Sequence, residues 1–236
     1  MAMIPFAINR SILENHEEAI YSNWDTRRCP HILMVGATGS GKTYAVKLLM
    51  GKVAKYAPNA KITVCDYKAE DFRFLDGCSR YYAFDRCADG LNAFFTEFEA
   101  RQSGEDDSRT MRLLVFDEWA AFLQNLDKKE AAEAQKKLAT LLMLGRSFNV
   151  HVLISVQRAD AEYFAKSRDN FSMVIAMGNI SKESAAMFGF DREAMLNCSE
   201  AGQGHILRNG VDLEPIIVPR IKNMKLLEET IRSAVE

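Results

Sequence analysis

PHILMVGATGSGKT, residues 30–43, is the stretch that decides the fold, because an apolar run ends there in a glycine-rich loop and a helical pattern follows. The loop satisfies the pattern G-x-x-x-x-G-K-[ST], in the strand-to-helix position that its mechanism requires. Glycines let successive backbone N–H groups point inward at phosphate oxygens, and the helix N-terminus adds partial positive charge. The stretch therefore predicts an ATP phosphate-binding loop, whose residues are Gly36, Ala37, Thr38, Gly39, Ser40, Gly41, Lys42 and Thr43.

Two side chains of this loop have separate expected roles. Lys42 is expected to reach the β and γ phosphates, and the Thr43 hydroxyl is expected to coordinate Mg²⁺. The alternative is a chance glycine-rich turn. The apolar strand before the loop and the helical pattern after it favour nucleotide binding.

A pair of adjacent carboxylates follows another apolar run. Residues 112–116 (RLLVF) lead directly into Asp117 and Glu118. We expect Asp117 to be the second metal ligand and Glu118 to polarise the attacking water as a general base. A strand that simply ends in two solvated acids is the alternative, and the phosphate loop upstream favours the catalytic interpretation.

One amide stands in a comparable position on the next apolar run. Residues 150–156 (VHVLISV) deliver Gln157 at the end of an expected strand, beside the Asp117 strand if the strand order is the usual one. Such an amide can sense the γ phosphate or position water. As a single residue it could equally be a strand-end surface group, and its place after the acidic pair favours the sensor.

Apolar runs alternate with helix-period segments along the chain, which indicates an α/β fold with a mostly parallel central sheet flanked by helices. The expected strands are residues 31–36, 61–67, 80–84, 112–117, 150–156 and 172–177, and the expected helices are residues 42–55, 88–101, 128–144, 182–188 and 225–234. Two final strands are expected around an Asn209-Gly210 turn. Residues 4–28 suggest one short edge strand and a polar approach containing Trp24.

Composition limits the class of protein and its partners. The 236 residues are 48% hydrophobic and 26% charged, which is ordinary for a soluble globular chain. The formal net charge of −2 supplies no global positive field, so any polyanion must be bound by local patches. The five cysteines show no C-x-x-C spacing, and no apolar run reaches the roughly 20 residues of a spanning helix. We expect a cytoplasmic protein without membrane insertion.

Several segments together resemble, in order, the motor domain of the FtsK/HerA group of DNA-translocating ATPases. They are PHILMVGATGSGKT, VCDYKAED, LLVFDEWAAFL, LGRSFNVHVLISVQR, FAKSRDNFSMVIAMG and GQGHIL. The resemblance implies a RecA-like P-loop core that works as a homo-oligomeric ring, a hexamer, and threads double-stranded DNA while hydrolysing ATP between subunits. It assigns residues 30–236 to the motor and leaves residues 1–29 as an edge segment packed on the core, one domain in all.

The resemblance also carries residue roles. Lys42 and Thr43 match the family's phosphate-loop pair, Asp117 and Glu118 its Walker B pair, and Gln157 its polar sensor.

Arg146 lies in a Gly-Arg-Ser element similar to the family's Gly-Arg-Ala, so it is a candidate for the catalytic arginine supplied in trans. A helix-end cation is the alternative. Arg158 is a second candidate for that role. Asp66, Lys68 and Glu70 follow a strand in a segment similar to the family's Asp-Pro-Lys element, where Tyr67 replaces the proline, and a solvated loop is the simpler interpretation there.

The DNA side of the motor is expected in residues 157–171, which mix cations with aromatic side chains. Arg158, Lys166 and Arg168 are the candidate contacts to backbone phosphates, with an ordinary solvated helix as the alternative. The chain shows no anchor, linker or winged-helix module, which suggests a compact form similar to coupling ATPases of conjugative elements.

Two other functions use the same phosphate loop. A protein-secretion ATPase shares the whole core and stays open as an alternative. A nucleotide kinase is disfavoured by the acidic pair and the Gln157 strand, and an ABC-type ATPase by the lack of an LSGGQ-like stretch.

Overall fold

The computed structural model describes residues 2–158, 160–164 and 167–236. Within them ten strands form one sheet in the order β2-β1-β10-β9-β8-β3-β7-β6-β4-β5. The strands are β1 (Met3–Asn9), β2 (Tyr21–Asp25), β3 (His31–Val35), β4 (Lys61–Asp66), β5 (Tyr81–Ala83), β6 (Arg112–Asp117), β7 (Val150–Val156), β8 (Met173–Met177), β9 (Gln203–Arg208) and β10 (Asp212–Ile217). The helices are α1 (Arg10–His16), α2 (Lys42–Tyr56), α3 (Cys87–Ser103), α4 (Trp119–Gln124), α5 (Lys128–Leu144), α6 (Lys182–Phe188) and α7 (Met224–Val235), with short 3₁₀ turns η1 (Arg73–Leu75), η2 (Phe84–Arg86), η3 (Gly145–Phe148), η4 (Ala161–Phe164) and η5 (Arg168–Asn170).

The central strands are parallel and confirm the expected fold class. Strand β3 lies between β7 and β8, and β6 and β4 continue the sheet beyond β7. In β3, β7 and β8 every residue is buried, so these strands have a nearly continuous apolar sequence instead of an alternating one. Because the strands are parallel, their carboxyl ends meet at one edge of the sheet.

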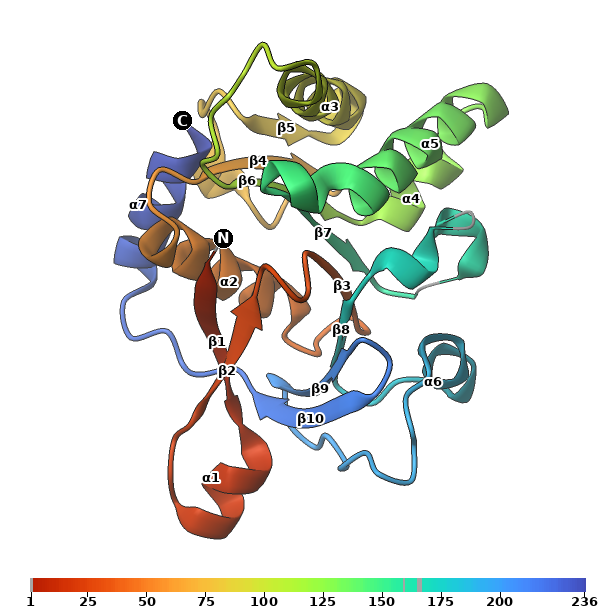
Figure 1. Ribbon diagram of the computed structural model, residues 1–236. Coiled ribbons are helices and arrows are strands. Elements are labelled where there is room, and N and C mark those ends of the chain that lie inside the picture. Colours follow the sequence, from red (N-terminus) through yellow and green to blue (C-terminus); the bar gives the residue numbers. More distant parts are fainter. Residues whose placement is uncertain (1, 159, 165–166) are drawn as a thin grey trace.

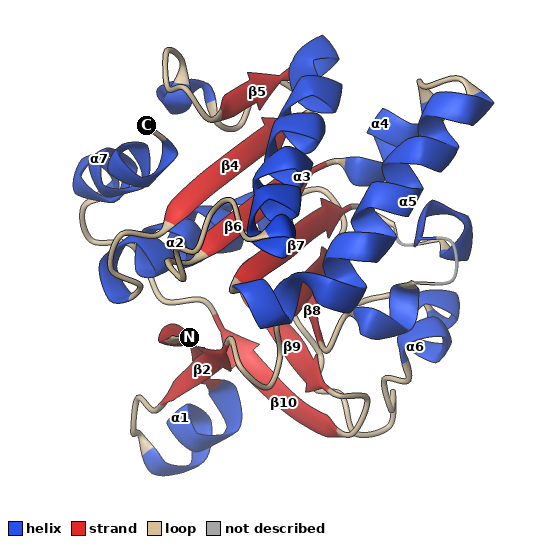
Figure 2. Cartoon of the chain, turned by 45° about the horizontal axis from the view of Figure 1, so that its top comes forward, coloured by secondary structure: helices blue, strands red, loops and turns tan. Residues whose placement is uncertain are grey.

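Helices cover both faces of this sheet and complete a three-layer core (Figures 1 and 2). On one face α2 packs against α7 and β1, and on the other α3, α4 and α5 contact the central strands. Each face has its own cluster of buried side chains. Helix α7 packs closely on α2, because Gly51 of α2 leaves room for Leu227 of α7. A Cβ at position 51 would lie 2.1 Å from the Leu227 Cδ1.

The antiparallel side of the sheet holds more structure than the sequence predicts. In place of one edge strand, residues 3–25 form β1, α1 and β2, and β1 pairs with both β2 and β10. In β2 the inward positions are occupied by Ser22 and Trp24. Because Ser22 is polar, the sequence lacks the alternation of apolar and polar residues that predicts a strand. Trp24 is fully buried and donates from Nε1 to the Cys29 carbonyl at 2.6 Å.

Elsewhere the expected elements agree closely with the structure. Every strand and helix that the sequence predicts from residue 31 onward is present, with ends within two residues of expectation. The Asn209-Gly210 turn between β9 and β10 is also present, with φ of 50° and 72°. The six-residue helix α4, which directly follows the acidic pair, was not predicted.

Two histidines start neighbouring central strands, at the amino edge of the sheet. His31 and His151 are both fully buried, and burial lowers the pKa of His31 to about 3 and that of His151 to about 4. The His31 Nδ1 accepts a hydrogen bond from the Val152 N–H at 3.2 Å. Both histidines are therefore neutral groups of the buried core.

In the part of the chain that the structure describes, no helix has the length and apolar character required to cross a bilayer.

Candidate functional site

The loop between β3 and α2 has the tight, left-handed backbone that its glycines allow. Gly39 and Gly41 have φ of 83° and 90°. A Cβ on Gly36 would lie 2.7 Å from the Met177 carbonyl oxygen, and one on Gly41 would lie 2.8 Å from the Gly202 nitrogen. The Gly202 N–H also donates to the carbonyl of Ser40 at 2.9 Å, so the start of the β9 segment supports the loop from behind.

Lys42, the first residue of α2, is buried and points at the ends of the two neighbouring strands. Its Nζ donates to Ser155 Oγ at 3.0 Å, and it lies 3.5 Å from Glu118 Oε1 and 3.8 Å from Asp117 Oδ1. A buried ammonium group needs such partners to offset its lost hydration. The three side chains therefore hold Lys42 at the position from which it could meet a phosphate bound in the loop.

Asp117 ends β6, opposite Ser155 of β7 in the sheet register. Burial raises its pKa to about 6, against the lowering effects of Lys42 and Ser155. Its Oδ1 atom has no hydrogen-bond partner among the described residues. A buried carboxylate oxygen without a hydrogen-bond partner suits a divalent cation, so Asp117 fits the Mg²⁺ that accompanies ATP. Thr43, the other expected ligand, follows Lys42 and lines the cleft over the phosphate loop.

Glu118 has a strained backbone, with φ of 58° and ψ of 44°, where α4 begins. Non-glycine residues seldom occupy this region, and those that do often lie at functional sites. Its Oε1 accepts a hydrogen bond from Gln157 Nε2 at 3.0 Å, and Gln157 Oε1 lies 3.5 Å from Thr38 Oγ1. The acid, the amide and the tip of the phosphate loop thus form one connected polar row.

A cleft of about 300 Å³ opens over the phosphate loop. Glu118, Gln157, Lys68 and Asp71 line it together with the phosphate loop, and Lys68 and Asp71 form a 3.4 Å ion pair.

Asp66, the last residue of β4, and Glu70 do not line this cleft, although Asp66 pairs with Asp117 in the sheet register. Asp66 is buried and accepts hydrogen bonds from the Ala69 and Phe72 N–H groups and from the Tyr81 hydroxyl, so it anchors the turn. Glu70 pairs with Arg73 on the surface.

The arginine candidates lie at different edges of the sheet. Arg158 follows the carboxyl end of β7, directly after Gln157, and its Nε lies 3.4 Å from Asp160. Arg146 belongs to η3, which precedes β7, so it lies at the amino edge. Strand β7 spans seven residues, and at about 3.3 Å per residue this separates Arg146 from its own cleft by roughly 20 Å.

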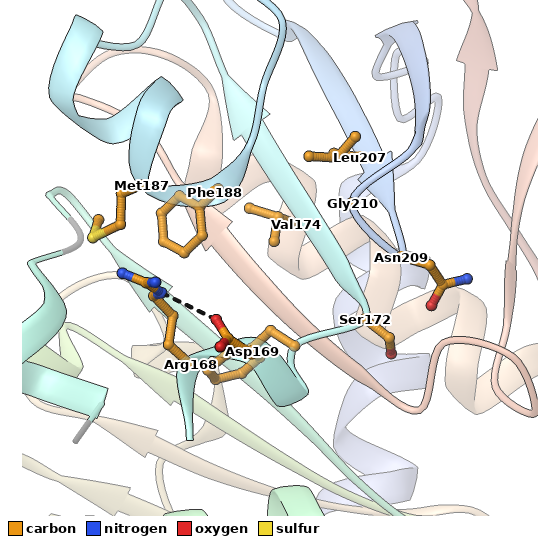
Figure 3. Close-up of a pocket in the computed structure, with 10 residues that line it drawn as sticks. Arg168, Asp169, Ser172, Val174, Met187, Phe188, Leu207, Asn209 and Gly210 are labelled. Carbon is orange, nitrogen blue, oxygen red and sulfur yellow. Dashed lines mark hydrogen bonds and ion pairs between the residues drawn. The ribbon is translucent and has the colours of Figure 1, made fainter. Parts of the chain in front are cut away.

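The predicted DNA contacts are likewise divided. Arg168 precedes β8 at the amino edge, where Figure 3 shows its ion pair with Asp169 beside a cavity lined by Val174, Phe188 and Leu207. Arg158 and Arg168 therefore do not form one surface patch. Lys166, the third candidate, lies outside the described residues.

Ser155 is a site residue that sequence reasoning missed. It is fully buried and contacts Lys42. Side chains two residues apart in a strand point to the same face, so the spacing from Ser155 to Gln157 within an apolar run was a usable signal. Gly202 was missed as well, because only the folded chain brings it against the phosphate loop.

Comparison with known proteins decides the family. The model of the FtsK/SpoIIIE family matches residues 4–178. The chain belongs to the FtsK/SpoIIIE family. Family membership confirms the resemblance seen in the motifs and makes the domain a P-loop ATPase of FtsK/SpoIIIE type. One relative is an FtsK domain-containing protein, YdcQ, of Bacillus subtilis (strain 168), 29% identical over 201 residues. The match covers 78% of this chain and 42% of the length of that relative.

Solved structures show the same fold at low sequence identity. The cytoplasmic domain of the type VII secretion ATPase EccC of Thermomonospora curvata matches with a TM-score of 0.73 and 17% identity, over 99% of this chain and 30% of that one. The pCW3 conjugation coupling protein TcpA, solved with ATPγS, matches with a TM-score of 0.70 and 18% identity, over 98% and 74%. The RecA-like α/β fold expected from the sequence is therefore confirmed.

Proposed function

We propose that this FtsK/SpoIIIE-type domain is an ATP-hydrolysing motor that moves double-stranded DNA, in conjugative transfer or DNA segregation. The observation that carries the enzymatic part is the convergence of Lys42, Glu118 and Gln157 at the carboxyl ends of β3, β6 and β7, over one cleft. Ligand sites of open α/β sheets lie at this edge.

The proposed roles follow from the position of each group. Lys42 exchanges its contacts with the acids for the β and γ phosphates. Glu118 is then free to accept the proton of the attacking water, which Gln157 orients through its amide. Thr43 and Asp117 are the proposed ligands of the Mg²⁺ that neutralises phosphate charge. The contact with Lys42 thus keeps Glu118 occupied until ATP binds, and the release of Lys42 then frees the base.

The position of Arg146 supports the proposal that copies of the chain assemble, because Arg146 lies too far from its own cleft to act there. Arg146 can therefore stabilise transition-state charge only at the cleft of a neighbouring copy. We propose a ring of identical chains, a hexamer, in which each Arg146 serves the next nucleotide.

The position of Arg158 supports the proposal that ATP turnover is coupled to DNA. Arg158 directly follows the sensor Gln157, and its side chain is 72% exposed. A few cations repeated around a ring suffice to hold a duplex despite the net charge of −2. Arg168 would contact the same duplex only if the DNA runs along the subunit from one sheet edge to the other.

Protein secretion is the second candidate function. Secretion ATPases occur among the similar structures, with EssC of Geobacillus thermodenitrificans at a TM-score of 0.71 beside EccC, although likeness at 11% identity concerns the fold alone.

One experiment separates the two candidates. ATP turnover is measured against protein concentration, alone, with duplex DNA, and with peptide substrates, using Lys42→Ala as the nucleotide-binding control. Cooperative turnover that duplex DNA stimulates supports the translocase. Stimulation by peptide alone would move the assignment to secretion, and unchanged ATP affinity in Lys42→Ala would contradict the nucleotide site itself.

A further inference from the structure

A second lysine lines the cleft, and the roles proposed so far do not include it. Lys68 lies in the loop after β4 and lines the cleft together with Lys42, Glu118 and Gln157. Its Nζ donates to Asp71 Oδ2 at 3.4 Å, and the two side chains are 50% and 29% exposed. An ion pair this open to water contributes little to stability. A phosphate oxygen that enters the cleft could therefore displace Asp71 from Lys68.

The strand order places the two lysines at opposite ends of a row of polar groups. Strands β3, β7, β6 and β4 are neighbours in that order, and the groups that come after their carboxyl ends are, in turn, Lys42, Gln157, Glu118 and Lys68. Three strand spacings of about 4.8 Å separate β3 from β4, roughly 14 Å in all. A group bound between these strands would meet one lysine from each end of the row.

The charges of the acidic pair also reach Lys68. The pKa of Lys68 lies above its ordinary value, chiefly because of Asp71, and the carboxylates of Asp117 and Glu118 add to this effect. The same two carboxylates contact Lys42. Both ammonium groups therefore lie close to one pair of acids, where the terminal phosphate of ATP would bring further negative charge.

The backbone of the loop that carries Lys68 is fixed. Buried Asp66 accepts hydrogen bonds from the N–H groups of Ala69 and Phe72 at 3.0 and 3.2 Å, and from the Tyr81 hydroxyl at 3.2 Å. Ala69 has a φ of 55°, in a region that non-glycine residues seldom occupy and that recurs at ligand-binding sites. Only the flexible side chain of Lys68 has to move for the exchange of partners.

The same loop packs against the helix that follows the proposed base. The Tyr67 ring makes an edge contact with Phe122 of α4, with ring centroids 5.7 Å apart. Helix α4 begins directly after Glu118. The contact thus holds the backbone of Lys68 in a set position relative to that of Glu118.

We propose that Lys68 is a second phosphate-binding residue, which leaves Asp71 and contacts the terminal phosphate of bound ATP. Lys42 contacts the β and γ phosphates, whereas Lys68 contacts the γ phosphate alone, so that Lys68 distinguishes ATP from ADP. The inference deepens the proposed function and rests on its nucleotide site. It requires neither DNA nor assembly of several copies.

The test compares two nucleotides in a variant that removes the charge and keeps the apolar stem, Lys68→Met. Loss of a charged hydrogen bond should weaken binding of a non-hydrolysable ATP analogue with magnesium at least about tenfold, and ADP affinity should change less than about twofold. Titration calorimetry measures both affinities on the full chain, at a concentration where sedimentation velocity shows single copies. Lys68→Arg restores the charge and should recover most of the preference for the analogue.

Arg73→Met is the matched control. Arg73 belongs to the same loop, forms an i,i+3 ion pair with Glu70 at 3.3 Å, and does not line the cleft. It also donates to the Ala69 carbonyl at 3.1 Å, so its removal would reveal an effect that acts through the turn alone. This control should keep the wild-type ratio of analogue affinity to ADP affinity. Circular dichroism checks that every variant is folded.

Several outcomes would overturn the role of Lys68. They are a wild-type ratio of the two affinities in Lys68→Met, an equal loss of both nucleotides, the same loss in Arg73→Met, and a loss that occurs only when copies assemble. The proposed nucleotide site fails on a different result, namely that the wild-type chain binds neither nucleotide or that Lys42→Ala binds both with unchanged affinity.

Discussion

At the scale of single residues, the site is a set of mutual restraints around Lys42. Its Nζ is shared by Ser155, Glu118 and Asp117, while Gln157 holds Glu118 from the other side. Each of these groups contacts another group of the site, and a bound phosphate would compete with the carboxylates for Lys42. Glu118, the proposed base, is the group whose role a substitution tests most directly.

Glu118→Gln should bind ATP with near-normal affinity and lower kcat by about 100-fold or more, because general-base catalysis contributes roughly that much. The amide keeps the size of the side chain and an oxygen that can accept from Lys42. Steady-state kinetics and nucleotide titration measure the two effects. Glu70→Gln is the matched control, since Glu70 pairs with Arg73 outside the cleft. Near-normal turnover in Glu118→Gln would remove the residue from this role.

His31 makes stability depend on pH. Its folded-state pKa of about 3 lies below the ordinary 6.5, so the native state keeps it neutral while the unfolded chain binds a proton. This contribution is complete above pH 6.5 and is lost as the pH falls from 6.5 toward 3.

Between pH 7 and pH 5 the wild-type chain should lose about 2 kcal/mol of unfolding free energy because of His31. His31→Asn, which keeps an acceptor for the Val152 N–H, should not show this loss. Urea unfolding at several pH values measures this difference, with exposed His16→Asn as the control. A wild-type pH slope in His31→Asn would contradict the assignment.

At the scale of elements, the phosphate loop depends on the segment that leads into β9. Gly202 donates to Ser40 and leaves no room for a Cβ on Gly41. A second glycine, Gly178, meets Ser40 from the end of β8, where a Cβ would lie 3.3 Å from the serine Cβ. The loop is thus held between two segments that are more than a hundred residues away in sequence.

Gly41→Ala should lose nucleotide binding by at least tenfold, because it combines a φ of 90° with a contact of 2.8 Å to backbone. Gly104→Ala is its matched control, with a φ of 84° and no atom within 4 Å of the added Cβ. That control should cost only about 1 kcal/mol of unfolding free energy and leave ATP binding intact. Equal ATP affinity in the two variants, measured by titration calorimetry, would show that the contact with Gly202 is unimportant.

At the scale of the whole molecule, the candidate functional residues lie at two opposite edges of the sheet. The carboxyl edge holds the cleft and Arg158, and the amino edge holds Arg146 and Arg168. One copy therefore carries the proposed catalytic groups and the proposed trans arginine at opposite edges of its sheet. Turnover per chain should consequently rise with protein concentration.

Arg158→Ala should weaken duplex binding about equally for every DNA sequence, because a phosphate contact reads charge and not bases. The slope of log affinity against log salt concentration should fall by about one. Fluorescence anisotropy at several KCl concentrations measures the slope. Arg28→Ala is the control, since the Arg28 side chain is 83% exposed and lies far along the chain from the sensor strand. An unchanged slope would exclude Arg158 as a phosphate contact.

The sequence by itself determined the α/β class, the central strands and helices, and the family, because each depends on local periodicity or on short contiguous motifs. It also named Lys42 from the phosphate-loop pattern, and Asp117, Glu118 and Gln157 because they follow apolar runs. It missed β2, where a buried serine breaks the alternation.

Only the tertiary structure decided which groups meet. Ser155 touches Lys42 because β7 lies between β3 and β6, and Gly202 supports the phosphate loop because β9 returns beside β8. Arg158 and Arg168, ten residues apart in sequence, lie at opposite edges because the chain crosses the sheet between them. Strand order and crossover direction are set by long-range packing of buried faces, which no single segment encodes.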